Sequence, residues 1–231
     1  MRALRVLLII LVIFGGLFVA GDRLAVNLAE DMAAEKIRGS QGLDRTPEVS
    51  IKGFPFLTQV LGRNLTEVDA DLGGMSASAD GRTLRVDKLR AQFHDVRLTS
   101  DYSSIESAAS ATGSATISYA DLTKAAGGGI KISYAGEKNG PRVKISPNLP
   151  LLSSVEVTGS LAVSGNTVRL RADEIPAMCK AIPTCQSKVR TQTDHVWTLN
   201  RLPGNLKLDE VVTKPEGISL SVSGKNVKLP G

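Results

Sequence analysis

The sequence predicts an α+β fold that is rich in β-strand, and three observations support this class. The 231-residue chain is 42% hydrophobic but only 4% aromatic, so its core consists mainly of small and aliphatic side chains, which favours sheet over a helical bundle. From residue 46 onward apolar and polar residues alternate, as in antiparallel strands with one buried face. Residues 22–39 have a helical period instead. No linker divides residues 22–231, which we expect to form a single domain.

Residues 1–21 have the composition of a signal peptide or an N-terminal membrane anchor. Arg2 and Arg5 precede an uncharged run from Val6 to Ala20. A helix of this length spans about 22 Å, short of the roughly 30 Å hydrocarbon core of a bilayer, which favours a signal peptide. No good Ala-x-Ala cleavage site follows, so cleavage and retention as a transmembrane helix both stay open. Either way the arginines keep the N-terminus inside and place the body outside the cytoplasm.

An amphipathic helix is predicted directly after this segment. Leu24, Leu28 and Met32 follow at four-residue spacing and form an apolar stripe, and Gly39 ends the pattern. The residues that flank this stripe are Ala25, Ala29 and Ala33, with Ile37 one turn beyond Ala33. We expect this stripe to pack on the sheet. The alternative is a helix that continues the membrane segment.

A long, strongly curved strand is predicted in the stretch RTLRVDKLRAQFHDVRLTS. Val86 lies at an even-numbered position, but Leu89 and Phe93 lie at odd-numbered positions and would face the other side of a regular strand. Val96 switches back again. Bulges cause such switches where a strand bends or coils. Short helices are predicted around residues 119–129 and 175–189, and residues 155–172 predict a hairpin.

A dense apolar knot interrupts the alternation between residues 53 and 62. Pro55 cannot donate to a ladder, so Gly53-Phe-Pro-Phe turns the chain out of the sheet, and a short helical cap follows. The cap is either a static plug that closes the core, or an acyl-chain gate or membrane-contacting tip. The apolar residues of the knot are Phe54, Phe56, Leu57, Val60 and Leu61.

The charge and motif content argue against nucleic-acid binding and against catalysis. The net charge of +5 is mild, and the body has no run of Lys and Arg longer than two. The chain lacks a nucleophile elbow, a zinc-protease motif, a P-loop and a dinucleotide fingerprint. His94 and His195 each neighbour an aspartate, but adjacent strand residues point to opposite faces. We therefore expect no catalytic residue, no cofactor, no metal and no enzyme activity.

Cys179 and Cys185 are the only cysteines, in a chain whose N-terminus indicates export. They predict a disulfide that closes a small local loop, worth about 2 kcal/mol on the chain-entropy model. The alternative is a zinc site completed by His94 and His195, for which the histidine spacing is too scattered.

Two stretches of the chain are specific enough to indicate a family. They are IKGFPFLTQVLGRNLTEVDADLGGM, residues 51–75, and NRLPGNLKLDEVVTKPEGISLSVSGKNVKL, residues 200–229. Both resemble the LmeA-like family of exported phospholipid-binding proteins from actinobacteria. The resemblance implies a tubular lipid-binding (TULIP-like) fold, similar to the bactericidal/permeability-increasing protein class, in which a long curved antiparallel sheet wraps around a long helix and leaves an apolar cavity. It also implies binding of phospholipid, phosphoinositides included, and a part in lipid transfer or lipoglycan (lipomannan) maturation. The two cysteines have no place in the family pattern.

These observations together predict a lipid-binding protein of the periplasm or cell envelope, at the outer face of the cytoplasmic membrane. Burial of acyl chains against aliphatic side chains provides the binding energy. Lys52 and Arg63 flank the knot and are the candidates for contacting the headgroup phosphate. Expected partners are phospholipid, the membrane surface and envelope glycolipid biosynthesis proteins. An envelope scaffold that binds proteins is the alternative, and a hydrolase or transferase comes after it. The candidate lipid-binding residues are Phe54, Phe56, Leu57, Val60, Leu61, Leu28, Met32 and Phe93.

Overall fold

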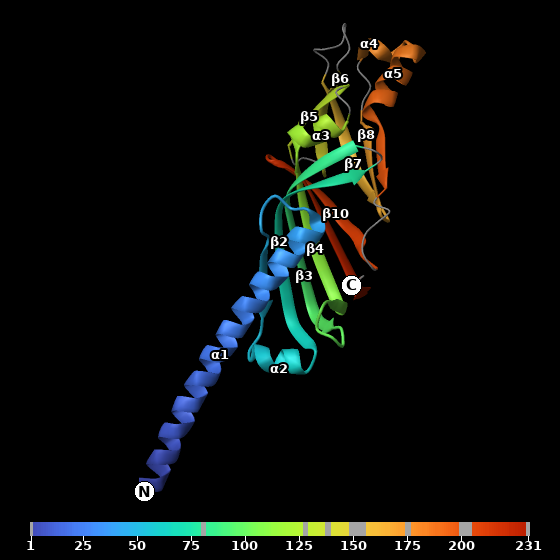
Figure 1. Ribbon diagram of the computed structural model, residues 1–231. Helices are drawn as coiled ribbons and strands as arrows, with labels where there is room; N and C mark the ends of the chain where they lie inside the picture. The colour runs from blue at the N-terminus through green and yellow to red at the C-terminus, as the bar shows by residue number, and fades with distance from the viewer. Residues whose placement is uncertain are drawn as a thin grey trace.

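One long helix stands beside two antiparallel sheets in the computed structural model of the chain (Figure 1). The structure describes residues 2–79, 82–126, 129–136, 140–147, 156–173, 177–198 and 205–229. The predicted α+β class, with a curled antiparallel sheet next to an N-terminal helix, is confirmed. The strands divide between two sheets, which the sequence did not distinguish.

Helix α1 runs without interruption from Arg2 to Gln41. The export segment and the following amphipathic helix are thus one element, which was the alternative that the sequence left open. The glycines inside it do not end the helix, because a single Gly costs only about 1 kcal/mol relative to Ala. Among the described residues, α1 is the helix that is long and apolar enough to cross a membrane.

The face of α1 that packs on the sheet contains only the flank of the predicted stripe. Leu24, Leu28 and Met32 are 71%, 62% and 65% exposed. Val26 and Ala34 are buried instead. The prediction was therefore wrong for the three large side chains and is confirmed for the residues that flank them. Small side chains let the helix approach the sheet closely, and the residues that join Val26 and Ala34 against the sheet core are Ala25, Ala29, Ala33 and Ile37.

The first sheet has six antiparallel strands in the order β1-β2-β3-β4-β11-β10. Helix α2 interrupts the chain between β1 and β2, as the proline-containing knot predicted. The elements are β1 (Glu48–Lys52), α2 (Phe56–Leu61), β2 (Asn64–Ala79), β3 (Arg82–Leu98), β4 (Ile105–Ser118), β10 (Lys207–Lys214) and β11 (Gly217–Lys228).

Strand β3 is irregular at the second of the two predicted parity switches. Its pairings with β2 and β4 omit Asp95, which has a φ of 50°, and resume at Val96 in the same register. A register shift against β4 follows between Arg97 and Leu98. The positive φ turns the strand locally without adding a residue to the pairing. As a result Phe93 and Val96 both contact the same core, although their spacing would put them on opposite faces of a regular strand.

The second sheet lies at the end of the molecule far from α2 and has the order β5-β6-β7-β8-β9 (Figure 1). The predicted hairpin is confirmed as β7 and β8, and both predicted short helical regions contain helix. The elements are α3 (Tyr119–Ala125), β5 (Ile130–Tyr134), β6 (Arg142–Pro147), β7 (Val157–Ser164), β8 (Thr167–Ala172), α4 (Ala177–Lys180), α5 (Pro183–Thr193) and β9 (His195–Thr198).

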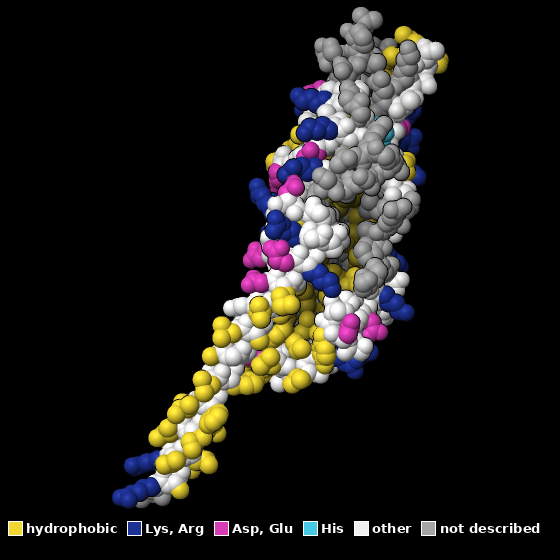
Figure 2. All heavy atoms as spheres, viewed as in Figure 1, with side chains coloured by type: hydrophobic (Ala, Val, Ile, Leu, Met, Phe, Trp, Pro, Cys, Tyr) yellow, Lys and Arg dark blue, Asp and Glu magenta, His cyan; other side chains and the backbone are white. Residues whose placement is uncertain are grey.

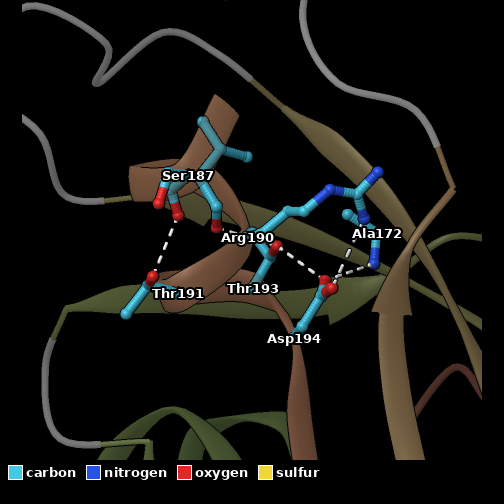
Figure 3. A network of polar contacts seen from close by, with 7 residues as sticks. Ala172, Ser187, Arg190, Thr191, Thr193 and Asp194 are labelled. Atoms are coloured by element: carbon cyan, nitrogen blue, oxygen red, sulfur yellow. Dashed lines mark hydrogen bonds and ion pairs between the residues drawn. The ribbon is translucent and has the colours of Figure 1, made fainter. Parts of the chain in front are cut away.

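Helices α4 and α5 are held in place by the disulfide and by a polar network. The predicted Cys179–Cys185 disulfide is confirmed, and it joins the two helices. Figure 3 shows Asp194, at the end of α5, whose Oδ1 accepts hydrogen bonds from the Ala172 backbone N–H at 3.0 Å and from Thr193 Oγ1 at 3.1 Å. These contacts tie α5 to strand β8.

Among the residues that the structure describes, many of the buried apolar side chains form two separate clusters. The first lies between α1 and the α2 end of the first sheet, and the second lies between the second sheet and strands β10 and β11. Buried residues of the first cluster are Val26, Ala34, Val49, Phe56, Leu65, Val68, Val96 and Ala108. Those of the second are Ile130, Ile132, Val143, Ile145, Leu161, Val168, Leu170, Leu208, Val211 and Ile218.

Candidate functional site

Helix α2 divides the apolar knot between the core and the surface. Phe56 is 6% exposed and Val60, one turn later, packs beside it against the first core cluster. Phe54, Leu57 and Leu61 point away from the core and are 56%, 36% and 78% exposed. Residues four apart lie on one face of a helix, so α2 has an inner apolar face and an outer one. We call the outer residues, Phe54, Leu57 and Leu61, the apolar base.

The buried carboxylate of Asp22 fixes α2 to helix α1. Asp22 is fully buried, and its Oδ1 accepts a hydrogen bond from the backbone N–H of Leu57 at 2.8 Å. This N–H belongs to the first turn of α2, where backbone donors have no partner inside the helix. Arg23 Nη2 lies 3.2 Å from Asp22 Oδ2, and the Arg23 guanidinium carbon lies 5.1 Å from the centre of the Phe54 ring. The base is thereby held beside residue 22 of α1.

A second carboxylate on the same face of α1 anchors strand β1. Glu30 Oε1 accepts a hydrogen bond from the Ile51 backbone N–H at 2.7 Å. Asp22, Val26 and Glu30 recur every four residues, so the packed face carries two acids around a small apolar centre. Sequence reasoning missed Asp22 and Glu30, because acidic side chains usually indicate a solvated face. Their spacing with Val26 is the signal that could have revealed them.

The opposite side of α1 presents the exposed apolar stripe of Leu24, Leu28 and Met32. At 100° per residue, Leu28 lies about 160° around the helix from buried Val26. Leu17 precedes Leu24 by seven residues and is 64% exposed on nearly the same side. The stripe therefore continues the apolar surface of the membrane segment up to the body. Figure 2 shows hydrophobic side chains extending from the helix onto the body without a charged break.

An apolar row lies on the first sheet between the two core clusters. Leu72, Leu89 and Ala115 are paired across β2, β3 and β4, and they have the parity of buried Val68 and Ala70 in β2. All three are partly buried and, in the part of the chain that the structure describes, belong to neither cluster. Figure 2 shows a recess beside the body part of α1 with hydrophobic side chains inside it. The recess and the row leave apolar surface that protein side chains do not fully cover.

The remaining predicted residues lie in different places. Phe93 packs against the first core cluster. Lys52 lies on the polar side of the sheet, where its Nζ donates to Ser50 Oγ at 2.9 Å and lies 4.0 Å from an Asp69 oxygen. Arg63 is exposed just after α2, and no ion pair involving it occurs among the residues that the structure describes. Arg63 is thus next to the apolar base, whereas Lys52 faces away from the recess.

The polar face of the first sheet carries an open hollow of about 580 Å³. Charged and hydroxyl side chains line it, among them Glu48 and Asp71. Arg90 Nε donates to Asp71 Oδ2 at 2.8 Å, and this hydrogen bond raises the pKa of the Arg90 guanidinium. Acyl chains gain nothing from such a lining, because its polar groups would lose their water. The apolar surface on the other face is the one that suits a lipid.

His94, the histidine considered for catalysis, belongs to this polar face. Its Nδ1 lies 3.3 Å from Glu67 Oε2 on the paired strand, and not against its sequence neighbour Asp95. The pair is partly exposed and has the geometry of a cross-strand surface contact. The disulfide uses both cysteines, which excludes the zinc alternative.

A family described as LmeA-like phospholipid-binding has a model that matches residues 20–223 of the chain. The protein belongs to this family. The LmeA-like match begins two residues before Asp22, so it includes the body part of α1 and leaves out most of the apolar run. Neither a search of curated proteins nor a search of solved structures found a match. The ligand class of the LmeA-like family is phospholipid, and the stripe and the recess are apolar surfaces that can receive its acyl chains.

Proposed function

We propose that the protein is exported and anchored by α1 in the cytoplasmic membrane, and that its body, residues 22–231, binds phospholipid in the recess between α1 and the first sheet. The observation that carries this proposal is the exposure of Leu24, Leu28 and Met32. A contiguous apolar surface on a folded protein indicates an interaction site. Here it leads from a membrane-length helix to an apolar recess, in a family that binds phospholipid.

The binding energy comes from acyl chains that leave water. Each buried CH₂ contributes about 0.8 kcal/mol, so part of one chain is sufficient for stable binding. The row of Leu72, Leu89 and Ala115 forms a wall of the recess. Leu28 and Met32, on the opposite side of α1, form the apolar surface along which an acyl chain reaches the recess from the membrane. Arg63, exposed beside the base, donates to the headgroup phosphate as a charge-assisted partner. Lys52 is the weaker headgroup candidate, because it contacts Ser50 and Asp69 on the polar face.

The biological role that we propose is to hold phospholipid, phosphoinositide included, at the outer face of the membrane and to pass it on during lipoglycan or lipomannan maturation. The protein then acts as a lipid carrier beside envelope glycolipid biosynthesis proteins and does not itself catalyse their reactions. Support for this role comes from the lipid-binding family and from the export signal or anchor at the N-terminus.

Photocrosslinking of lipid in the membrane tests the binding site. The full chain is reconstituted into phosphatidylcholine and phosphatidylglycerol vesicles that contain a phospholipid with a photoactivatable acyl chain, and adducts are mapped by mass spectrometry. We expect adducts on residues 28–32 and on the apolar row, in addition to those on the membrane segment. Lipid that merely surrounds the span labels residues 6–25 alone, and this result would contradict the proposal.

A further inference from the structure

The uncharged run of α1 is shorter than the hydrocarbon core of a bilayer, although α1 as a whole is long and apolar enough to cross a membrane. Val6 to Ala20 spans about 22 Å, against about 30 Å of hydrocarbon. The missing 8 Å or so corresponds to about five helical residues. A short span is accommodated by local thinning of the bilayer and by flanking side chains that extend toward water, so the next residues of the helix lie close to the lipid. The residues that follow the run are therefore at the level of the membrane interface.

Helix α2 lies at this same level, since Asp22 binds its first turn through the Leu57 N–H. The base places three exposed apolar side chains there from a part of the chain outside α1. Two charged residues of α1, Asp22 and Arg23, lie at the level of α2, and neither opposes insertion. Asp22 is fully buried, and Arg23 lies against the Phe54 ring with a long side chain that can extend toward water. Leu24, 71% exposed, adds to the apolar surface from α1 itself.

We propose that the apolar base, Phe54, Leu57 and Leu61, is inserted into the outer interface of the same bilayer that α1 crosses. The base adds apolar surface over the part of the bilayer thickness that the apolar run does not span. Because the base lies directly beside the span, the surface that it contacts is lipid and not a second protein. The insertion requires a retained span but does not require the recess to hold lipid. It places the lower end of the stripe in contact with the bilayer, which lets an acyl chain move along α1 without crossing water.

Fluorescence quenching by brominated lipid measures the insertion directly. Trp197 in β9 is the single tryptophan of the chain, so replacing it with phenylalanine gives a silent background. In this background one variant carries Phe54→Trp and its matched control carries Ile182→Trp; the two native side chains are 56% and 49% exposed. Ile182 precedes α5, at the end of the body far from α2 (Figure 1).

Both full-length variants are reconstituted into phosphatidylcholine and phosphatidylglycerol vesicles, with or without bromine on the acyl chains. We expect bromine to quench the tryptophan at position 54 strongly and the one at position 182 little. Leu61→Ser is then added to the variant with tryptophan at position 54. It should lower the ratio of protein with the base in the bilayer to protein with the base outside it about tenfold, because a largely exposed leucine no longer enters the lipid. The quenching at position 54 should fall accordingly.

Equal quenching at the two positions would overturn the proposal, and so would protection of position 54 by a second copy of the chain, seen as crosslinked dimers. The result is separable from the photocrosslinking test. Quenching at position 54 with adducts on α1 restricted to residues 6–25 keeps the inserted base and refutes the lipid site. Adducts on the stripe without quenching at position 54 keep the lipid site and refute the inserted base.

Discussion

Replacing Leu28 and Met32 together with glutamine should weaken phospholipid binding and leave the fold intact. The two side chains are 62% and 65% exposed, so the folded protein gains little from them. Complete burial of such a side chain is worth about 1.5–3 kcal/mol, so covering the exposed two-thirds with an acyl chain yields about 1–2 kcal/mol each. Losing both corresponds to about a 30-fold to 1000-fold weaker affinity. Glutamine has a helix propensity close to that of leucine and methionine, so α1 should persist.

The assay is the yield of photocrosslinked lipid outside the span, measured against the mole fraction of the photoactivatable lipid in the vesicles. The control is Ile182→Gln, which removes a similarly exposed apolar side chain at the far end of the body. Urea unfolding of the body should shift by no more than about 0.5 kcal/mol for each surface substitution. If the double variant crosslinks at the same lipid fraction as the original chain, the stripe is not part of the binding site and the reasoning fails.

Three further outcomes are expected. Asp22→Ala should accelerate amide hydrogen exchange at Leu57, whose N–H loses its acceptor; unchanged protection would show that α2 is held by packing alone. Phe56→Ala should lower the free energy of unfolding by about 3–5 kcal/mol and Phe54→Ala by less than about 1 kcal/mol, measured in urea; similar losses would contradict the division of α2 into two faces. Reducing the disulfide should cost about 2 kcal/mol and leave lipid crosslinking unchanged, since the bridge is far from α2; reduced crosslinking would link it to the site.

The parts of the fold that the sequence predicted depend on local rules. Alternation identifies strands because one face of the sheet is buried, and the second of the two parity switches in β3, between Phe93 and Val96, occurs at the positive φ of Asp95. Pro55 likewise acts locally, because it cannot donate to a ladder and so keeps the knot out of the sheet. The division of the strands between the two sheets does not follow from local rules. The pairing of Ala115 with Leu220 joins segments far apart in the chain, and no local period contains that information.

The site was only partly predictable, since apolar residues that contact lipid and those that contact protein look alike in a sequence. The helical spacing put Leu28 and Met32 on one stripe with the flanking Ala29 and Ala33, but only the two alanines approach the sheet. An acid such as Asp22 is equally ambiguous. Its burial becomes intelligible only when the start of α2, which follows more than thirty residues later, is placed against it.

The unbroken course of helix α1 limits how far the protein can reach. The portion from residue 22 to 41 is about 30 Å long, and hydrogen bonds at Asp22 and Glu30 clamp it to the body at two heights. A body clamped in this way has no hinge at the membrane, so it cannot swing toward a distant acceptor. In the proposed carrier role, any molecule that collects the lipid therefore has to approach the body itself, within about 30 Å of the membrane surface.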